Sequence, residues 1–174
     1  MNHAQVVEQL PGLRRYARAL TGDAWAADDL VQDTLERACR KWLLWRSGSN
    51  LRAWLFTLMH NLYLNQRRGV TATLALDDDA LAALPNPDGP AHDTLLDLDR
   101  CLQRLPAEQR AVLLLVTLED MAYADVARVL KIPVGTVMSR LSRARSRMRE
   151  LLHHSSAPTV ASAPPAALPL RRLK

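Results

Sequence analysis

The chain has 174 residues, with 23 Lys or Arg side chains and 18 Asp or Glu side chains. No apolar run approaches the roughly 20 residues that a membrane-spanning helix needs. The first residues also lack the basic and then apolar pattern of a secretory signal. The two cysteines, Cys39 and Cys101, lie far apart and form no metal-ligand pattern. Neither a phosphate-binding glycine motif nor a catalytic constellation is present. We therefore expect a cytoplasmic protein without membrane insertion, metal, cofactor or enzymatic site.

Basic and acidic residues are separated along the chain. Residues 1–68 carry 10 basic and 6 acidic side chains, and residues 69–99 carry 7 acidic and no basic ones. Residues 100–154 carry 10 basic and 5 acidic side chains, and residues 155–174 carry 3 basic ones. Two basic segments on either side of an acidic one indicate a polyanionic partner that is contacted at two places. Two solvated helical surfaces are the alternative explanation.

Apolar residues at spacings of three and four predict three helices in the N-terminal part, over residues 5–20, 24–45 and 51–66. Asp23 is a candidate N-cap for the second of them. Residues 46–50 are predicted to form a short polar loop. Seven of the eight aromatic residues lie before residue 69. Among these, three tryptophans are expected in the core, namely Trp25, Trp42 and Trp45.

The remaining chain is predicted to contain an acidic linker, a second group of helices and a tail. The linker covers residues 69–94 and is expected to be flexible. Helices are predicted over residues 94–105, 106–118, 122–130 and 134–152. Residues 155–174 are rich in Ala, Pro and Ser and are predicted to be disordered. The fold class is therefore all-α, with two small helical domains (1–68 and 95–154) joined by a flexible acidic linker.

The last two predicted helices have the order of a helix-turn-helix, with a turn at residues 131–133. In the second helix, a predicted buried stripe runs from Val134 to Leu151 or Leu152. Another face carries hydroxyl and guanidinium groups, from Thr136, Ser139, Arg140, Arg143 and Arg147. Such groups bind phosphates and guanine edges in the major groove. A solvated surface helix is the alternative explanation.

Two motifs resemble a known family. The sequence DDLVQDTLERAC at residues 28–39, followed by NLRAWLFTLMHNLYLNQRR at residues 50–68, resembles the promoter-melting domain of bacterial sigma factors. Residues 105–151 resemble the helix-turn-helix domain of the same family. The chain is thus identified as similar to the small extracytoplasmic-function (ECF) group, which has only these two domains.

The resemblance implies that the first motif binds the clamp helices of the β′ subunit of core RNA polymerase. We expect its acidic face to pair with basic residues and an exposed Leu30 to supply an apolar anchor. Without the resemblance, an ordinary capped amphipathic helix explains the same pattern. The polymerase-binding candidates are Asp28, Asp29, Leu30, Gln32, Asp33, Leu35 and Glu36.

The resemblance assigns recognition and melting of the −10 promoter element to residues 46–68. Melting needs a pocket for a flipped base and stacking surfaces for its neighbours. The candidates are Ser47, Ser49, Asn50, Arg52, Trp54, Asn61, Asn65, Arg67 and Arg68. Trp54 is equally a candidate for the core. The five residues of the helix-turn-helix face are then the candidates for recognition of the −35 element.

The resemblance therefore implies an alternative sigma factor that binds core RNA polymerase and directs promoter-specific transcription initiation, controlled by an anti-sigma factor. Two rivals stay open. One is a sigma-like decoy that sequesters an anti-sigma factor without binding DNA, and the other is a helix-turn-helix regulator with an unrelated N-terminal domain. In the family the two promoter elements lie roughly 17 base pairs apart, or about 58 Å. An extended linker reaching up to ~90 Å would bridge that distance.

Overall fold

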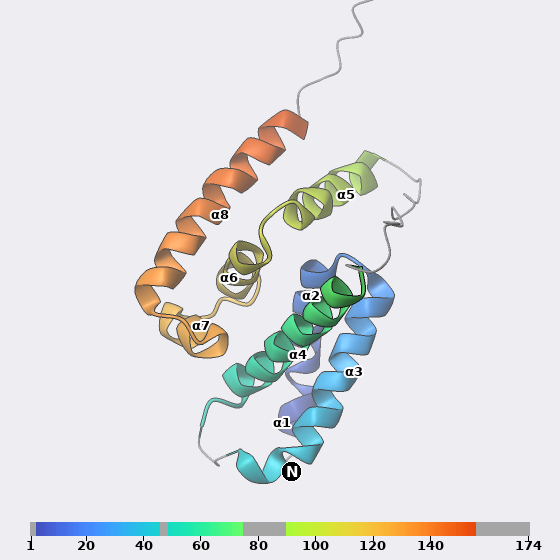
Figure 1. The fold of residues 1–174 in the computed structure, drawn as a ribbon, viewed down its shortest axis with the longest axis vertical. Helices are drawn as coiled ribbons and strands as arrows, with labels where there is room; N and C mark the ends of the chain where they lie inside the picture. Colours follow the sequence, from blue (N-terminus) through green and yellow to red (C-terminus); the bar gives the residue numbers. More distant parts are fainter. Residues whose placement is uncertain (1–2, 46–48, 75–89, 156–174) are drawn as a thin grey trace, which may run out of the picture.

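The computed structural model describes residues 3–45, 49–74 and 90–155, and the regular structure in these ranges is entirely helical. The first bundle contains α1 (His3–Val7), α2 (Leu10–Thr21), α3 (Ala24–Arg40) and α4 (Leu51–Leu74). The second contains α5 (Pro90–Gln103), α6 (Ala107–Thr117), α7 (Tyr123–Leu130) and α8 (Val134–Ser155) (Figure 1). The prediction of an all-α protein with two helical units is confirmed.

The helix predicted over residues 5–20 is divided in two. Pro11 lies in the first turn of α2, where its missing N–H and fixed φ are tolerated, so α1 ends before it. Gly22 ends α2 in the left-handed conformation, with φ of 74°. Asp23 then caps α3 as predicted, because its Oδ1 accepts a hydrogen bond from the Ala26 N–H at 2.7 Å.

The described helices extend into both ends of the predicted linker. α4 continues to Leu74 instead of ending at residue 66, and α5 begins at Pro90 instead of residue 94. The predicted helix over residues 24–45 ends earlier, at Arg40, and a short 3-10 helix, η1 (Trp42–Leu44), follows it. Residues 75–89 of the linker and 156–174 of the tail lie outside the described residues.

The helix-turn-helix is present as predicted. α7 ends at Leu130, and its C-cap residue Lys131 has a positive φ of 55° at the start of the turn to α8. The Ile132 N–H donates to the Ala127 carbonyl at 3.0 Å and thereby fixes this turn. α8 buries Val137, Leu141 and Ala144 at helical spacing, so its opposite side faces solvent.

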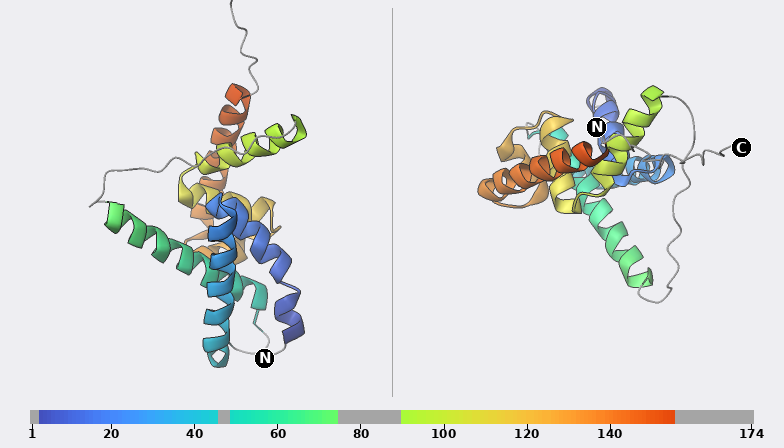
Figure 2. Two further views of the ribbon diagram at one scale, coloured as in Figure 1. Left: turned by 90° about the vertical axis from the view of Figure 1, so that its right-hand side faces the viewer. Right: turned by 90° about the horizontal axis from the view of Figure 1, so that it is seen from above.

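The two bundles pack against each other. α4 contacts α7, and α2 contacts both α5 and α6 (Figure 1); Figure 2 shows the same arrangement from two further sides. The buried apolar residues of both bundles form one continuous cluster. The sequence patterns predicted the bundles but not this packing, because the contacting residues of the two bundles lie far apart in the sequence.

Among the described residues, no helix combines the length and apolar character that crossing a lipid bilayer requires. Within the same ranges, no three His, Cys, Asp or Glu side chains are grouped as ligands for a metal ion. Cys39 lies exposed on α3 and Cys101 lies buried on α5, and the two are not joined by a disulfide.

Candidate functional site

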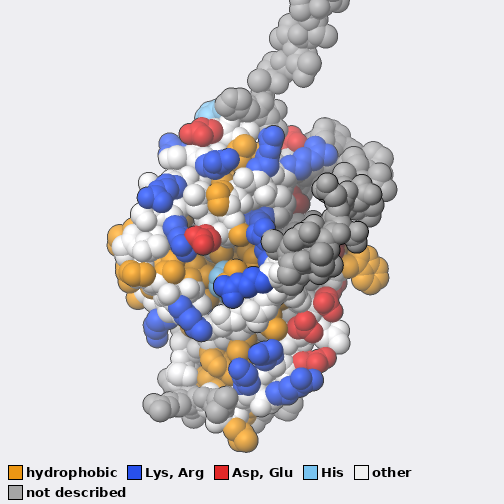
Figure 3. Space-filling view, in the orientation of Figure 1, with side chains coloured by type: hydrophobic (Ala, Val, Ile, Leu, Met, Phe, Trp, Pro, Cys, Tyr) orange, Lys and Arg blue, Asp and Glu red, His pale blue; other side chains and the backbone are white. Residues whose placement is uncertain are grey.

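An open groove of about 980 Å³ lies along α2 and α3. Acidic side chains gather over α3 on the face seen in Figure 3. The residues that line the groove are Arg14, Arg18, Asp28, Val31, Gln32, Leu35, Glu36, Cys39 and Arg40. Four of the predicted polymerase-binding residues are therefore brought together here, namely Asp28, Gln32, Leu35 and Glu36. The groove combines the carboxylates of Asp28 and Glu36 with three arginine side chains and with the apolar side chains of Val31 and Leu35.

The expectation of an exposed Leu30 is wrong. Leu30 is completely buried, because it falls in helical phase with Ala27, Thr34 and Ala38, which face the inside of the bundle. The half-buried Leu35 is the apolar candidate that reaches the groove.

The other two candidates on α3 lie outside the groove lining. Asp29 is exposed beside it. Asp33 accepts a hydrogen bond from Gln66 Nε2 of α4 at 3.3 Å, so its carboxylate helps to hold α3 against α4. A polar motif on one helix thus serves both its surface and its packing.

The candidates for the −10 element divide over two sides of α4. At about 100° per residue, Trp54, Asn61, Asn65 and Arg68 fall within one narrow stripe. Arg52 and Arg67 fall on the other side of the helix, and the Arg67 guanidinium lies over the Tyr63 ring at 6.0 Å. Ser49 and Asn50 are exposed just before α4, and Ser47 lies outside the described residues.

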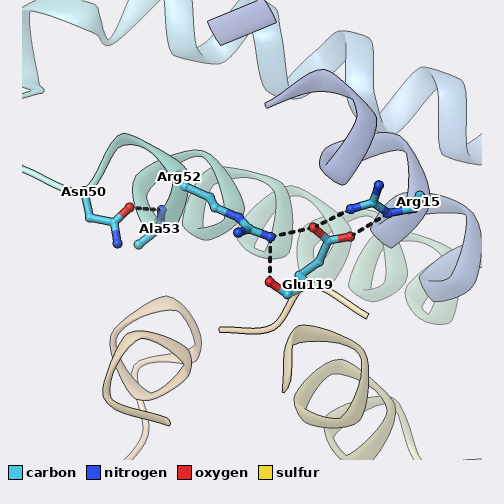
Figure 4. A network of polar contacts seen from close by, with 5 residues as sticks. All are labelled: Arg15, Asn50, Arg52, Ala53 and Glu119. Carbon is cyan, nitrogen blue, oxygen red and sulfur yellow. Dashed lines mark hydrogen bonds and ion pairs between the residues drawn. The ribbon is translucent and has the colours of Figure 1, made fainter. Parts of the chain in front are cut away.

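Asn50 has a structural role. Its Oδ1 accepts a hydrogen bond from the Ala53 N–H at 3.0 Å and caps α4 (Figure 4). The cap fixes the start of the helix that carries the stripe, so it positions those side chains.

Three of the four tryptophans pack against one another, and the fourth is exposed. Trp54 is partly buried and meets Trp42 edge to face at 6.1 Å, and Trp42 lies 4.9 Å from Trp45. The expectation that Trp25 belongs to the core is wrong, since it is 86% exposed. Its position in the first turn of α3 points away from the bundle, and spacing alone did not reveal this.

Arg52 is engaged by the second bundle. Its Nη2 donates to the carboxylate Oε2 of Glu119 at 2.8 Å and to the Glu119 backbone carbonyl at 2.6 Å (Figure 4). The Arg15 Nε of α2 donates to the same carboxylate at 3.3 Å. Glu119 and Arg15 were not among the predicted residues. They lie 67 and 37 positions from Arg52 in the sequence, so no local pattern relates them.

The recognition face of α8 is exposed. Thr136, Ser139, Arg143 and Arg147 form one stripe along the helix, with Ser139, Arg143 and Arg147 exposed and Thr136 partly so. Arg140 lies at the edge of this stripe, where it pairs with Glu108 of α6 and its side chain is 24% exposed. The two-sided helix required for major-groove binding is therefore present in this bundle.

One further residue, His60 of α4, was not predicted. Its ring is 8% exposed and its Nδ1 has no hydrogen-bond partner among the described residues. Burial, with a smaller contribution from the positive charge of Arg140, lowers the pKa of His60 to about 4. His60 is therefore a neutral residue of the core at the side of α4 that faces the second bundle.

Comparison with known proteins gives the same assignment for both bundles. Residues 6–60 match the family model of the sigma2 domain of PhyR, and residues 95–148 match that of sigma-70 region 4. The chain is 37% identical over 150 residues to the ECF RNA polymerase sigma factor EcfG of Rhodopseudomonas palustris, covering 85% of this chain and 83% of the relative. It is 35% identical to the ECF sigma factor SigE of Mycolicibacterium smegmatis, covering 86% of this chain and 60% of that one.

A solved structure resembles the whole arrangement. The sigma factor RpoE of Bartonella quintana, crystallised in complex with the anti-sigma factor NepR, is 36% identical with a TM-score of 0.75. The match covers 86% of this chain and 95% of RpoE. These likenesses extend over both bundles, so the chain belongs to the extracytoplasmic-function family of RNA polymerase sigma factors.

Proposed function

We propose that the two bundles of this sigma factor divide promoter recognition between them. The stripe on α8 reads the −35 element. The stripe on α4, with the exposed residues before it, captures and melts the −10 element. The chain acts in the cytoplasm, where core polymerase and chromosome meet, and the polymerase performs the chemistry.

One observation carries this proposal. The exposed stripe of α8 consists of hydroxyl and guanidinium groups, and it lies on the side away from the buried stripe. Arginines reach guanine edges and phosphates from such a face, and hydroxyls bind phosphates. A decoy that only captures an anti-sigma factor has no use for this face.

The polymerase contact is assigned to the groove along α2 and α3. The exposed carboxylate of Asp28 suits basic clamp helices, and Leu35 supplies apolar contact area beside it. Glu36 adds a second carboxylate, which pairs with Arg40 of the same helix at 3.5 Å. The partner is core RNA polymerase, through its β′ clamp helices. An anti-sigma factor is the proposed regulator, since the similar RpoE of Bartonella quintana was crystallised with one.

Run-off transcription with bacterial core RNA polymerase tests the assignment. Transcript starts mapped after overexpression supply the promoter. We expect initiation from that promoter with the wild-type chain. Arg143→Ala should weaken it by about 1–3 kcal/mol in binding free energy if the side chain contacts a base.

The matched control is Arg149→Ala. Arg149 lies exposed on the same helix, about 120° around it from the stripe. Its Nε donates to the Arg145 carbonyl at 3.3 Å. Both variants remove one positive charge, so only a contact specific to the stripe separates them. Equal losses of initiation in the two variants would mean that the stripe contributes only nonspecific positive charge. Core binding without initiation at any genomic fragment would favour the decoy.

A further inference from the structure

The first two turns of α8 expose an apolar side that lies apart from the stripe of hydroxyl and guanidinium groups. Val134 begins the helix and is 39% exposed, and Met138 follows one turn later and is 52% exposed. In Figure 3, hydrophobic side chains gather at the left edge of the molecule, where α8 begins. Single exposed apolar residues are common on protein surfaces. This pair is distinguished by its place at the end of the helix-turn-helix that enters DNA.

Met138 and the stripe lie on the two flanks of one exposed arc. At about 100° per residue, Met138 falls about 140° from Arg143 around α8. The residues between them in the first three turns are small and exposed, namely Gly135, Ser139 and Ser142. A Cβ atom added at Gly135 would meet no atom within 4 Å, so this surface is open. The start of α8 therefore has a low centre and longer side chains on both flanks.

The dimensions of the major groove bring both flanks close to the bases. The groove is about 12 Å wide and about 8.5 Å deep, and a helix with its side chains is about 10–12 Å across. In a helix-turn-helix, the N-terminal residues of the second helix contact the base edges. A helix that enters with Gly135 and Ser139 toward the bases therefore has Met138 at one edge of the groove and Arg143 at the other.

The chemistry of Met138 matches one group in the major groove. The C5 methyl of thymine is the apolar feature that base pairs present there, and their other distinguishing features are hydrogen-bond donors and acceptors. A thioether is at most a weak acceptor, so Met138 cannot satisfy a base amino group. Its unbranched and polarisable side chain adapts to an irregular apolar surface. Contact with thymine also removes apolar surface of both partners from water.

We propose that Met138 is a specificity-determining residue, which reads a thymine of the −35 element through contact with its C5 methyl group. Val134 extends the apolar contact by one turn toward the start of the helix. The inference rests on the proposed function and adds to it a base identity, since the −35 element must then hold an A·T pair opposite Met138. The stripe on the other flank supplies the hydrogen bonds and the phosphate contacts.

The later turns of the same side do not share this role. Arg149 lies about 20° from Met138 around α8, but about 16 Å further along the helix axis. This distance exceeds the depth of the groove, which is about 8.5 Å. The apolar contact is therefore confined to the first turns of α8, and Arg149 remains a control for positive charge.

Replacement of thymine by deoxyuridine tests the contact at a single methyl group. Deoxyuridine keeps the hydrogen-bonding edge of thymine and lacks only the methyl. Once mapped transcript starts have identified the promoter, each thymine of the −35 element is replaced in turn. Run-off initiation is then measured with the full-length chain and core polymerase, at limiting concentrations of both. We expect one position at which the replacement lowers initiation about fourfold, the factor that corresponds to burial of one methyl group.

Met138→Ala completes a double-mutant cycle between protein and DNA. The variant removes the apolar side chain from an exposed helical site and leaves a strong helix former there. It should lower initiation from the unmodified promoter by a similar factor, and deoxyuridine at the identified position should then have no further effect. Leu98→Ala, at an apolar site of α5 that is 40% exposed, is the matched control and should keep the full sensitivity to deoxyuridine. Far-UV circular dichroism verifies that both variants keep their helices.

Three results would overturn the inference. The first is a −35 element without an A·T pair, and the second is a loss on deoxyuridine replacement that is equal in the wild type and Met138→Ala at every thymine. The third is a loss of co-purification with core polymerase in Met138→Ala, which would make the apolar side a protein contact. Failure of the proposed function has a separate signature, which is the absence of a run-off transcript or initiation that does not depend on the −35 sequence.

Discussion

His60 provides a test of the packing by pH. The residue lies on α4, is 8% exposed, and has its pKa lowered from 6.5 to about 4, first by burial and then by Arg140. The unfolded chain binds a proton near pH 6.5, whereas the folded chain does so only near pH 4. The stability that His60 contributes is therefore complete above the unfolded pKa and is lost as the pH falls toward 4.

The magnitude follows from the two pKa values. Integrating the proton binding of one group from neutral pH gives a loss of about 2 kcal/mol at pH 5 and about 3 kcal/mol at pH 4. Arg140 belongs to α8 of the second bundle, so a protonated ring would also repel that bundle.

Urea unfolding of the wild type and His60→Gln at several pH values isolates this contribution. All four tryptophans lie before residue 55, so their fluorescence follows the bundle that holds His60. Glutamine does not titrate, and the difference in unfolding free energy between the two proteins should change by about 2 kcal/mol from pH 7.5 to pH 5. His153→Gln, at an exposed site near the end of α8, should follow the wild type. A difference that stays constant over this range would refute the reasoning.

Three further predictions concern the first bundle. Leu30→Ala should lower the free energy of unfolding by about 2–5 kcal/mol in urea, and Leu35→Ala, at a half-buried site, by clearly less. Asn50→Ala should cost about 1 kcal/mol by removing the cap of α4, and Asn50→Ser should restore most of it in the same assay. Asp28→Arg should abolish co-purification with core polymerase through charge repulsion at the groove, with Glu8→Arg as the control.

Each of these three predictions would be contradicted by a specific result. Near-equal losses for the two leucine variants would mean that Leu30 is not the core residue of α3. Asn50→Ser as unstable as Asn50→Ala would place the importance of Asn50 outside its cap. Retained co-purification of Asp28→Arg would move the polymerase contact away from the groove.

The sequence predicted those features that depend on residues a few positions apart. The helix-turn-helix follows from apolar spacing and a three-residue turn, and both are local. Asp23 was recognised as a cap because cap and helix are adjacent. Pro11 divides a predicted helix, because apolar periodicity does not register a missing N–H group. The end of α4 was missed because Gly69, a residue typical of helix ends, lies inside this helix.

The two wrong assignments, of an exposed Leu30 and a buried Trp25, both lie on α3 and concern the direction of a side chain. Leu30 stands between Asp29 and the polar residues of the motif, but only one residue in three or four shares its direction. Trp25 has the size of a core residue and begins α3 at a position that the bundle does not cover. In both cases the side chain's direction depends on the phase of the helix against its neighbours, which requires the packed structure.

The interdomain contact was beyond any local pattern, and its chemistry is that of a buried carboxylate held by two arginines. Glu119 lies 104 and 67 positions from its two arginines. The related feature in the sequence is Gly12 inside α2, where an added Cβ atom would lie 2.6 Å from the Glu119 carboxylate. Well-packed apolar residues in place of a buried ion pair often stabilise a protein equally or better. An apolar contact would, however, leave two hydrophobic surfaces in water after separation, whereas charged side chains regain their hydration. Charge at this position would therefore lower the cost of separating the two bundles, compared with an apolar contact of the same size.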